Sequence, residues 1–98
     1  MQRLSVDAYV IDTLMPDLVQ HDRRPSAFLV FLYLWRRSAG AARTTVASYR
    51  MLADGTGLSK RAVQDAIRVL TRRRLIDVAK KSPTATPVFT LRCHWRDR

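Results

Sequence analysis

The stretch that decides the fold runs from residue 48 to residue 78 and reads SYRMLADGTGLSKRAVQDAIRVLTRRRLIDV. Ser48 is a good helix N-cap, because a serine oxygen accepts hydrogen bonds from the free backbone N–H groups of a first helical turn. Gly55 and Gly57 end that helix, and Ser59 is placed to cap the next one. The stretch therefore predicts a short helix, a glycine turn and a second helix.

The second helix of this stretch is amphipathic, because its apolar residues recur at spacings of three and four. One face is apolar and consists of Val63, Ala66, Ile67 and Leu70. The other face is charged and consists of Arg61, Asp65, Arg68 and Arg72. A helix with one apolar and one basic face is predicted to pack on a core and to present positive charge to a partner.

A β-hairpin is predicted after the second helix. Residues 75–79 (LIDVA) and 88–91 (VFTL) are short β-prone runs. The loop between them, residues 80–87, contains two prolines and two lysines, as expected of a turn-rich basic connection. Residues 43–46 (RTTV) form a further short β-prone patch ahead of the first helix of the stretch.

In this arrangement residues 48–78 resemble the helix-turn-helix of winged-helix DNA-binding proteins. The matching positions are Leu52, Ala53, Gly57, Leu58, Ser59, Val63, Ile67, Leu70, Leu75 and Ile76. Residues 86–91 (TPVFTL) resemble the returning strand of the wing. The resemblance implies a mainly α fold with a small β-hairpin wing (α+β), of the type found in bacterial or phage transcriptional regulators and in replication initiators.

Arg74 departs from the pattern of this family. Winged helices usually place glycine just before the Leu-Ile pair, where the chain leaves the helix through a left-handed conformation. A residue other than glycine in that conformation costs about 1 kcal/mol. The alternative is that Arg74 extends a longer helix, and either outcome affects the angle of the wing more than the fold.

The resemblance also implies which residues meet the bases of DNA. The start of a recognition helix enters the major groove, where arginine pairs with guanine and glutamine with adenine. We expect Arg61, Gln64 and Arg68 to contact bases. Asp65 either accepts from a cytosine amino group or orients a neighbouring arginine, and we favour orientation. For each of these residues the alternative is an ordinary solvated helix face.

Contacts to the DNA backbone are expected from the start of the recognition helix, the start of the preceding helix and the wing loop. The residues are Ser59 and Lys60, then Ser48, Tyr49 and Arg50, and then Lys80, Lys81 and Thr84. Arg43 is a further candidate beside the preceding helix. The run of arginines at 72–74 is expected in part to favour the helix C-terminus or to face solvent.

Two further helices are predicted ahead of the quoted stretch. Apolar residues recur at helical spacing from Ser5 to about Val19, with Ser5 as the cap. Because Pro16 falls within this run, a kink or break is expected around Leu14 and Met15. A second helix is predicted over 26–38, ending at Gly40. Because it is apolar on every face, it is expected to be either central in the fold or part of a subunit interface.

Length and charge suggest one domain with two kinds of surface. A chain of 98 residues fits a single domain (1–98), with 26–92 as the winged-helix core and 1–22 as an extra N-terminal helix. The net charge of +10 favours a polyanionic partner. Residues 1–22 carry a net −3 and the rest of the chain +13, so we expect the N-terminal helix to pack against protein, as a dimerisation element.

Catalysis, metals and membranes are not expected. Cys93 is the single cysteine, which excludes an internal disulfide and a cysteine-based zinc site. Cys93 and His94 are the one nucleophile and base pair in view, and neighbours on a strand point to opposite faces. We predict no catalytic residue, no metal site and no cofactor. The N-terminus lacks a signal peptide and the longest apolar run, 27–35, is too short for a bilayer, so a cytoplasmic location is expected.

We interpret the chain as a sequence-specific binder of double-stranded DNA, most simply a small transcriptional regulator that acts by occupying its site, as a homodimer. Two alternatives stay open. The first is the DNA-binding module of a phage or plasmid replication initiator, which has the same sequence features. The second is a winged helix that binds only protein, with the N-terminal helix offering the contact surface.

Overall fold

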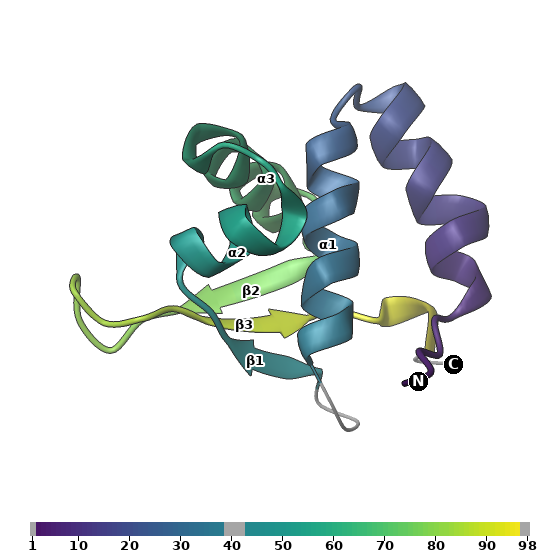
Figure 1. Cartoon of the computed structure of the whole chain (residues 1–98). Coiled ribbons are helices and arrows are strands. Elements are labelled where there is room, and N and C mark those ends of the chain that lie inside the picture. Colours follow the sequence, from purple (N-terminus) through teal and green to yellow (C-terminus); the bar gives the residue numbers. More distant parts are fainter. Residues whose placement is uncertain (1, 39–42, 97–98) are drawn as a thin grey trace.

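The computed structural model describes residues 2–38 and 43–96. After an N-terminal helical segment (residues 8–21), the elements are α1 (Pro25–Arg37), β1 (Thr44–Val46), α2 (Tyr49–Thr56), α3 (Lys60–Arg72), β2 (Ile76–Ala79), β3 (Val88–Leu91) and the 3-10 helix η3 (His94–Arg96). Figure 1 shows the helices on one side of a small sheet, with the β2–β3 loop extending away from the body. The predicted winged helix-turn-helix is confirmed.

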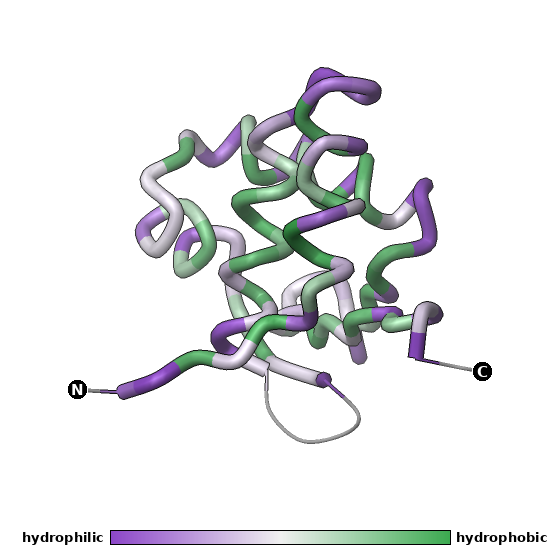
Figure 2. Tube along the Cα trace, turned by 90° about the vertical axis from the view of Figure 1, so that its right-hand side faces the viewer, coloured by the Kyte–Doolittle hydropathy of each residue, from purple (hydrophilic) through white to green (hydrophobic). Residues whose placement is uncertain are grey.

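Helix α1 is the centre of the fold. Proline at its first position has a fixed φ suited to a helix start and no N–H to leave unpaired. Its buried residues are Ala27, Phe28, Val30, Phe31, Leu34 and Trp35. Figure 1 shows α1 between the N-terminal helical segment and the α2–α3 pair, and Figure 2 shows hydrophobic residues concentrated in the interior. Of the two places predicted for this helix, the central one is correct; the predicted end at Gly40 lies outside the described residues.

The helix-turn-helix is held by the caps that the sequence predicts. The Ser48 hydroxyl accepts a hydrogen bond from the Met51 N–H at 3.1 Å, at the start of α2. The Ser59 hydroxyl accepts one from the Ala62 N–H at 3.1 Å, at the start of α3. Between them, Gly57 ends α2 in a left-handed conformation with φ of 80°, which glycine adopts without steric cost.

The sheet has three antiparallel strands in the order β1-β3-β2. The β2–β3 hairpin was predicted, and β1 pairs with the free edge of β3, placing Thr44 opposite Thr90. Phe89 on β3 is fully buried, so the sheet closes the core beneath the helices. The β-prone patch before α2 thus becomes an edge strand that ties the start of the helix-turn-helix to the wing.

Arg74 adopts the left-handed conformation, with φ of 56°. The alternative of a longer helix is wrong, because α3 ends at Arg72. The Leu75 N–H donates to the Leu70 carbonyl at 2.9 Å, a bond that satisfies a carbonyl at the helix end. Leu75 is also buried, and the two contacts offset the cost of a left-handed arginine.

The N-terminal helical segment starts later than predicted and passes through its proline. The helix begins at residue 8, three residues after Ser5, so the prediction that Ser5 caps it is wrong. The Ser5 backbone carbonyl instead accepts a hydrogen bond from Trp35 Nε1 at 2.8 Å. Two π-helical stretches, η1 (Val10–Leu14) and η2 (Asp17–His21), lie on either side of Pro16. The wider π-helical turn accommodates a residue without an N–H, so no break forms.

The C-terminal residues fold back on the N-terminal segment instead of forming a tail. The Asp7 carboxylate accepts hydrogen bonds from Trp95 Nε1 at 2.8 Å and from Arg96 at 2.5 and 2.7 Å. The Trp95 ring stacks on Tyr9 with ring centroids 4.6 Å apart, and on the buried Trp35 at 6.4 Å. We call these five residues the terminal cluster; it joins both ends of the described chain to α1.

Acid is expected to weaken the terminal cluster. The hydrogen bonds from Arg96, and then from Trp95, lower the pKa of Asp7 from its ordinary 3.8 to about 2. A carboxyl with a lowered folded-state pKa stabilises the fold above about pH 4, and this contribution is lost as the pH falls toward 2. We therefore expect Asp7→Asn to be less stable than wild type at pH 7 and to lose less stability between pH 5 and pH 2.5, measured by urea unfolding. The control is Asp12→Asn, which alters an exposed carboxyl of the same segment; equal losses in wild type and Asp7→Asn would contradict this role of Asp7.

A second link joins the end of α3 to the N-terminal helical segment. Arg73 donates to Asp17 and to Asp22, both at 2.6 Å. The hydrogen bond to Asp17 and the nearby Asp22 raise the pKa of Arg73, while His21 and Arg73 lower the pKa of Asp22. Together with Asp7, three of the four aspartates in residues 1–22 therefore bind side chains elsewhere in the same molecule.

Candidate nucleic-acid interface

The exposed face of α3 presents the three predicted base-contacting residues side by side. An α-helix turns by roughly 100° per residue, which places Arg61, Gln64 and Arg68 within an arc of about 60°. All three are exposed, and the buried face of the helix, including Val63 and Leu70, lies on the opposite side. The three side chains therefore point together into solvent, on the side of α3 away from the core.

Asp65 orients Arg68. Its carboxylate accepts a hydrogen bond from Arg68 Nη1 at 3.1 Å, one turn along the helix. Both side chains stay largely exposed, at 46% and 71%, so the pair positions the guanidinium without removing it from solvent. Of the two roles predicted for Asp65, this geometry favours orientation, and the arginine concerned is Arg68.

A groove separates α3 from the wing and gathers predicted contact residues from three elements. Those lining it are Ser48 and Tyr49 at the start of α2, Lys60 and Gln64 on α3, and Lys80 and Thr84 on the wing loop. We call it the wing groove. The Lys80 ammonium lies 6.0 Å from the centre of the Tyr49 ring, at the outer limit of a cation–π contact, so the wing loop and α2 meet across it.

The two capping serines keep a hydrogen-bond donor. Each accepts a backbone N–H through its oxygen, and a serine hydroxyl has one hydrogen that this bond does not use. Ser48 and Ser59 are therefore able to donate to a phosphate from the starts of two helices, where the backbone N–H groups also favour negative charge. Each serine can therefore cap its helix and donate to a phosphate at the same time.

The remaining predicted contacts lie outside the wing groove. Lys81 is exposed on the wing loop, and Arg50 is exposed on α2 with only a long 4.0 Å ion pair to Asp54. Arg43 is not on this surface: its guanidinium lies 3.9 Å from the centre of the Trp35 ring and donates to the Trp35 carbonyl at 3.0 Å. Arg43 therefore packs against α1, because a left-handed turn with φ of 47° directs the chain back toward that helix.

Sequence reasoning missed some residues of the wing groove. Pro83, Ala85, Thr86 and Pro87 line it from the wing loop. The hairpin prediction defined the loop but gave no sign of which of its residues turn toward α3, because that depends on how the loop folds back. The two prolines restrict the conformations of the loop, and this restriction is the one feature of the sequence that pointed to a defined loop structure.

A helix-turn-helix followed by a wing, with an arginine-rich helix face exposed beside a lysine-bearing loop, defines a class of nucleic-acid-binding domains. The chain belongs to the helix-turn-helix domain family, whose model matches residues 24–76, more than half of its length. The match runs from the start of α1 to the first residue of β2. Membership indicates DNA binding.

The other comparisons add nothing to this assignment: neither a curated protein nor a solved structure matches the chain. Within residues 2–38 and 43–96, no helix has the length and hydrophobicity needed to cross a bilayer. In the same described residues, no three potential metal-binding side chains come together.

Proposed function

We propose that this protein binds double-stranded DNA at specific sequences and regulates transcription in the cytoplasm by occupying its site. The observation that carries the proposal is the arc of Arg61, Gln64 and Arg68 on α3, set beside the wing groove in a chain of net charge +10. Arginine and glutamine are the side chains that pair with guanine and adenine edges through two hydrogen bonds.

In the proposed complex α3 lies in the major groove. Arg61, Gln64 and Arg68 contact base edges, with Asp65 holding Arg68 in place. The other residues of the wing groove, apart from Gln64, contact the sugar-phosphate backbone on the flank of α3 that faces the wing, and they fix the position of the protein without reading sequence. Bound protein then regulates transcription by excluding polymerase from the site it occupies.

The test is binding of the full chain to a pool of random duplexes at two salt concentrations, with sequencing of the retained DNA. We expect an enriched motif whose binding weakens with salt, because phosphate contacts release counterions. Salt-sensitive binding without a motif would reduce the protein to a general DNA binder. No binding at either salt concentration would overturn the proposal and favour a winged helix that binds protein.

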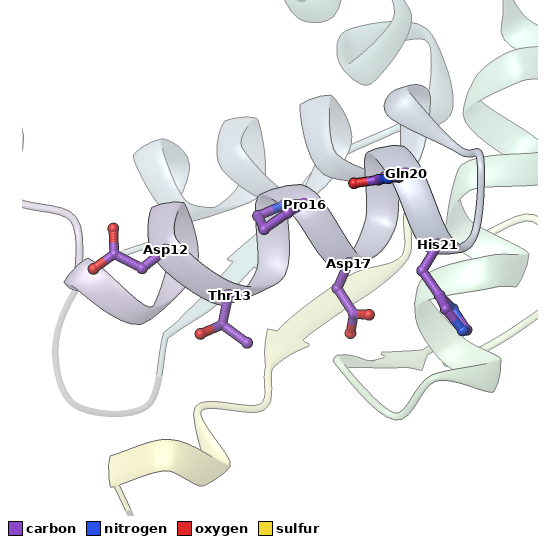
Figure 3. Close-up of a pocket in the computed structure, with 6 residues that line it drawn as sticks. All are labelled: Asp12, Thr13, Pro16, Asp17, Gln20 and His21. Atoms are coloured by element: carbon purple, nitrogen blue, oxygen red, sulfur yellow. The ribbon is translucent and has the colours of Figure 1, made fainter.

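We further propose that residues 1–22 hold two copies of the chain together. The buried face of α1 is used within one chain. Large apolar side chains that stay exposed include Leu29 on α1, Val46 on β1 and Met51 on α2, and the N-terminal helical segment carries three more in a single row. Ile11, Met15 and Val19 are spaced four residues apart and are each 38–40% exposed. Figure 3 shows the neighbouring polar side chains of this segment, including Asp12 and Gln20, around a shallow open hollow.

Dimerisation is expected to depend on this apolar row. Met15→Asp places a charge in the proposed contact and should yield a monomer at micromolar concentration, whereas wild type should have twice the mass in analytical ultracentrifugation. The DNA motif enriched by wild type should then be a palindrome, and that of Met15→Asp a single half-site. The control is Asp12→Asn, which should stay dimeric, and a monomeric wild type would contradict the proposal.

A further inference from the structure

A second hollow lies on the flank of α3 away from the wing groove, between α3 and the start of α1. Four of the side chains that line it are arginines, namely Arg23, Arg24, Arg68 and Arg72. Ser26, Asp65 and the edges of Pro25, Ala62 and Val69 complete the lining. We call this feature the arginine hollow.

Two separate segments bring these arginines together. Arg68 and Arg72 are one turn apart on α3, so they lie on the same side of that helix. Arg23 and Arg24 come from the turn between η2 and α1, which is held by a hydrogen bond from the Arg24 N–H to the Leu18 carbonyl at 2.8 Å. In that turn Arg23 has a left-handed φ of 54°.

The positive charge of the arginine hollow is only partly balanced. Asp65 is the one carboxylate in its lining, and it is already bonded to Arg68 at 3.1 Å. Within residues 2–38 and 43–96, Arg23, Arg24 and Arg72 form no ion pair with a carboxylate. Like charges held close together repel, and an anion placed among them removes that repulsion.

We propose that the arginine hollow binds phosphates of the DNA strand on the far side of the major groove from the wing. The major groove is bordered by one phosphate backbone on each side, and α3 carries a phosphate-binding surface on each flank: the wing groove and the arginine hollow. Guanidinium groups bind phosphate through paired N–H donors, which makes Arg23, Arg24 and Arg72 fitting phosphate ligands, while Arg68 at the edge of the hollow faces the bases. This inference rests on the proposed function and extends it by assigning contacts to the second strand of the DNA duplex.

The test compares the full-length wild type with Arg24→Gln/Arg72→Gln on the duplex that wild type selects. Each lost phosphate contact lowers the slope of log K against log salt by about 0.9, so the slope should fall by about two for each bound copy of the chain, and binding at ~0.1 M salt should weaken roughly ten-fold or more. The enriched motif should not change. The control is Arg3→Gln/Arg36→Gln, which removes the same charge from exposed positions near the other end of α1 and should keep the wild-type slope.

A second measurement locates the contact. Within each half-site, replacing single phosphates with neutral methylphosphonates should weaken wild-type binding on both strands, and the double variant should lose its sensitivity on one of these two strands. An unchanged salt slope in the double variant, or wild-type sensitivity confined to one strand of a half-site, would overturn the inference while leaving DNA binding intact. Wild type that binds no duplex at all would overturn the proposed function itself.

Discussion

Replacement of Trp35 by alanine is expected to lower the free energy of unfolding by about 3–5 kcal/mol, the usual cost of truncating a fully buried aromatic residue. The Trp35 side chain is fully buried and donates to the Ser5 carbonyl. Its ring also contacts Arg43 and stacks on Trp95, so one truncation loosens α1, the start of β1 and the terminal cluster together. Urea unfolding followed by far-UV circular dichroism measures the loss.

The matched variant is Trp35→Phe, which keeps an aromatic ring in the same space and removes the indole N–H. It should cost about 1–3 kcal/mol, from the lost hydrogen bond to the Ser5 carbonyl and from the space left by the smaller ring in a fully buried site. Equal losses for the alanine and phenylalanine variants would show that the hydrogen bond, and not the buried ring, carries the stabilisation. The DNA-facing residues are untouched in both variants, so any folded fraction should keep the wild-type sequence preference.

Arg61→Ala is expected to weaken the sequence preference at one base position. The difference in binding free energy between the preferred base and the other bases should fall there by about 1–3 kcal/mol. Arg61 is exposed on the arc of α3 that it shares with Gln64 and Arg68, so its removal should change the sequence preference of binding more than the stability of the fold. Selection from the random pool, followed by affinity measurements on single-base variants of the motif, gives the result. Melting temperatures of wild type and variant should agree.

Lys81→Ala is the companion to that experiment. Lys81 is exposed on the wing loop, where a cation meets phosphate rather than base edges. Its loss should weaken binding to all sequences by a similar factor and lower the salt slope by about one, with the motif unchanged. If Arg61→Ala and Lys81→Ala behave alike, the division between base-reading and backbone-binding residues is wrong.

The local parts of the fold were predictable from the sequence. Ser48 and Ser59 cap α2 and α3 because a serine before an amphipathic run acts only on its own first turn. Gly57 and Arg74 take left-handed conformations that follow from the need to leave a helix at those points. Each of these features depends on residues within one or two turns, so no knowledge of distant contacts was needed.

The parts that the sequence did not reveal depend on residues far apart in the chain. Arg96 and Asp7 are separated by 89 positions, and nothing in the composition of residues 94–96 indicates that they fold back. Arg73 was expected to interact with the end of its own helix, but the carboxylates of Asp17 and Asp22 lie closer.

The candidate site was predictable to the same extent. Helical periodicity alone placed Arg61, Gln64 and Arg68 on one arc of α3. It did not show that the two flanks of that helix differ, since one flank meets the wing loop and the other meets Arg23 and Arg24. Those two arginines come from a turn that carried no motif, and only the packing of α1 against α3 brings them beside Arg72.

The pairing of aspartates in the N-terminal helical segment has a consequence for how the molecule travels toward DNA. Carboxylates of that segment pair with Arg73 and Arg96 and neutralise them, whereas the arginines and lysines on the solvent face of α3 and on the wing loop stay exposed. Figure 1 shows the N-terminal helical segment on one side of α1, and α3 and the wing loop on the other. Net positive charge is therefore concentrated on the α3 side, and we expect the field of a DNA duplex to turn that side toward it within about a Debye length, ~10 Å at 0.1 M salt. The resulting gain in productive encounters should fade as ions screen the field.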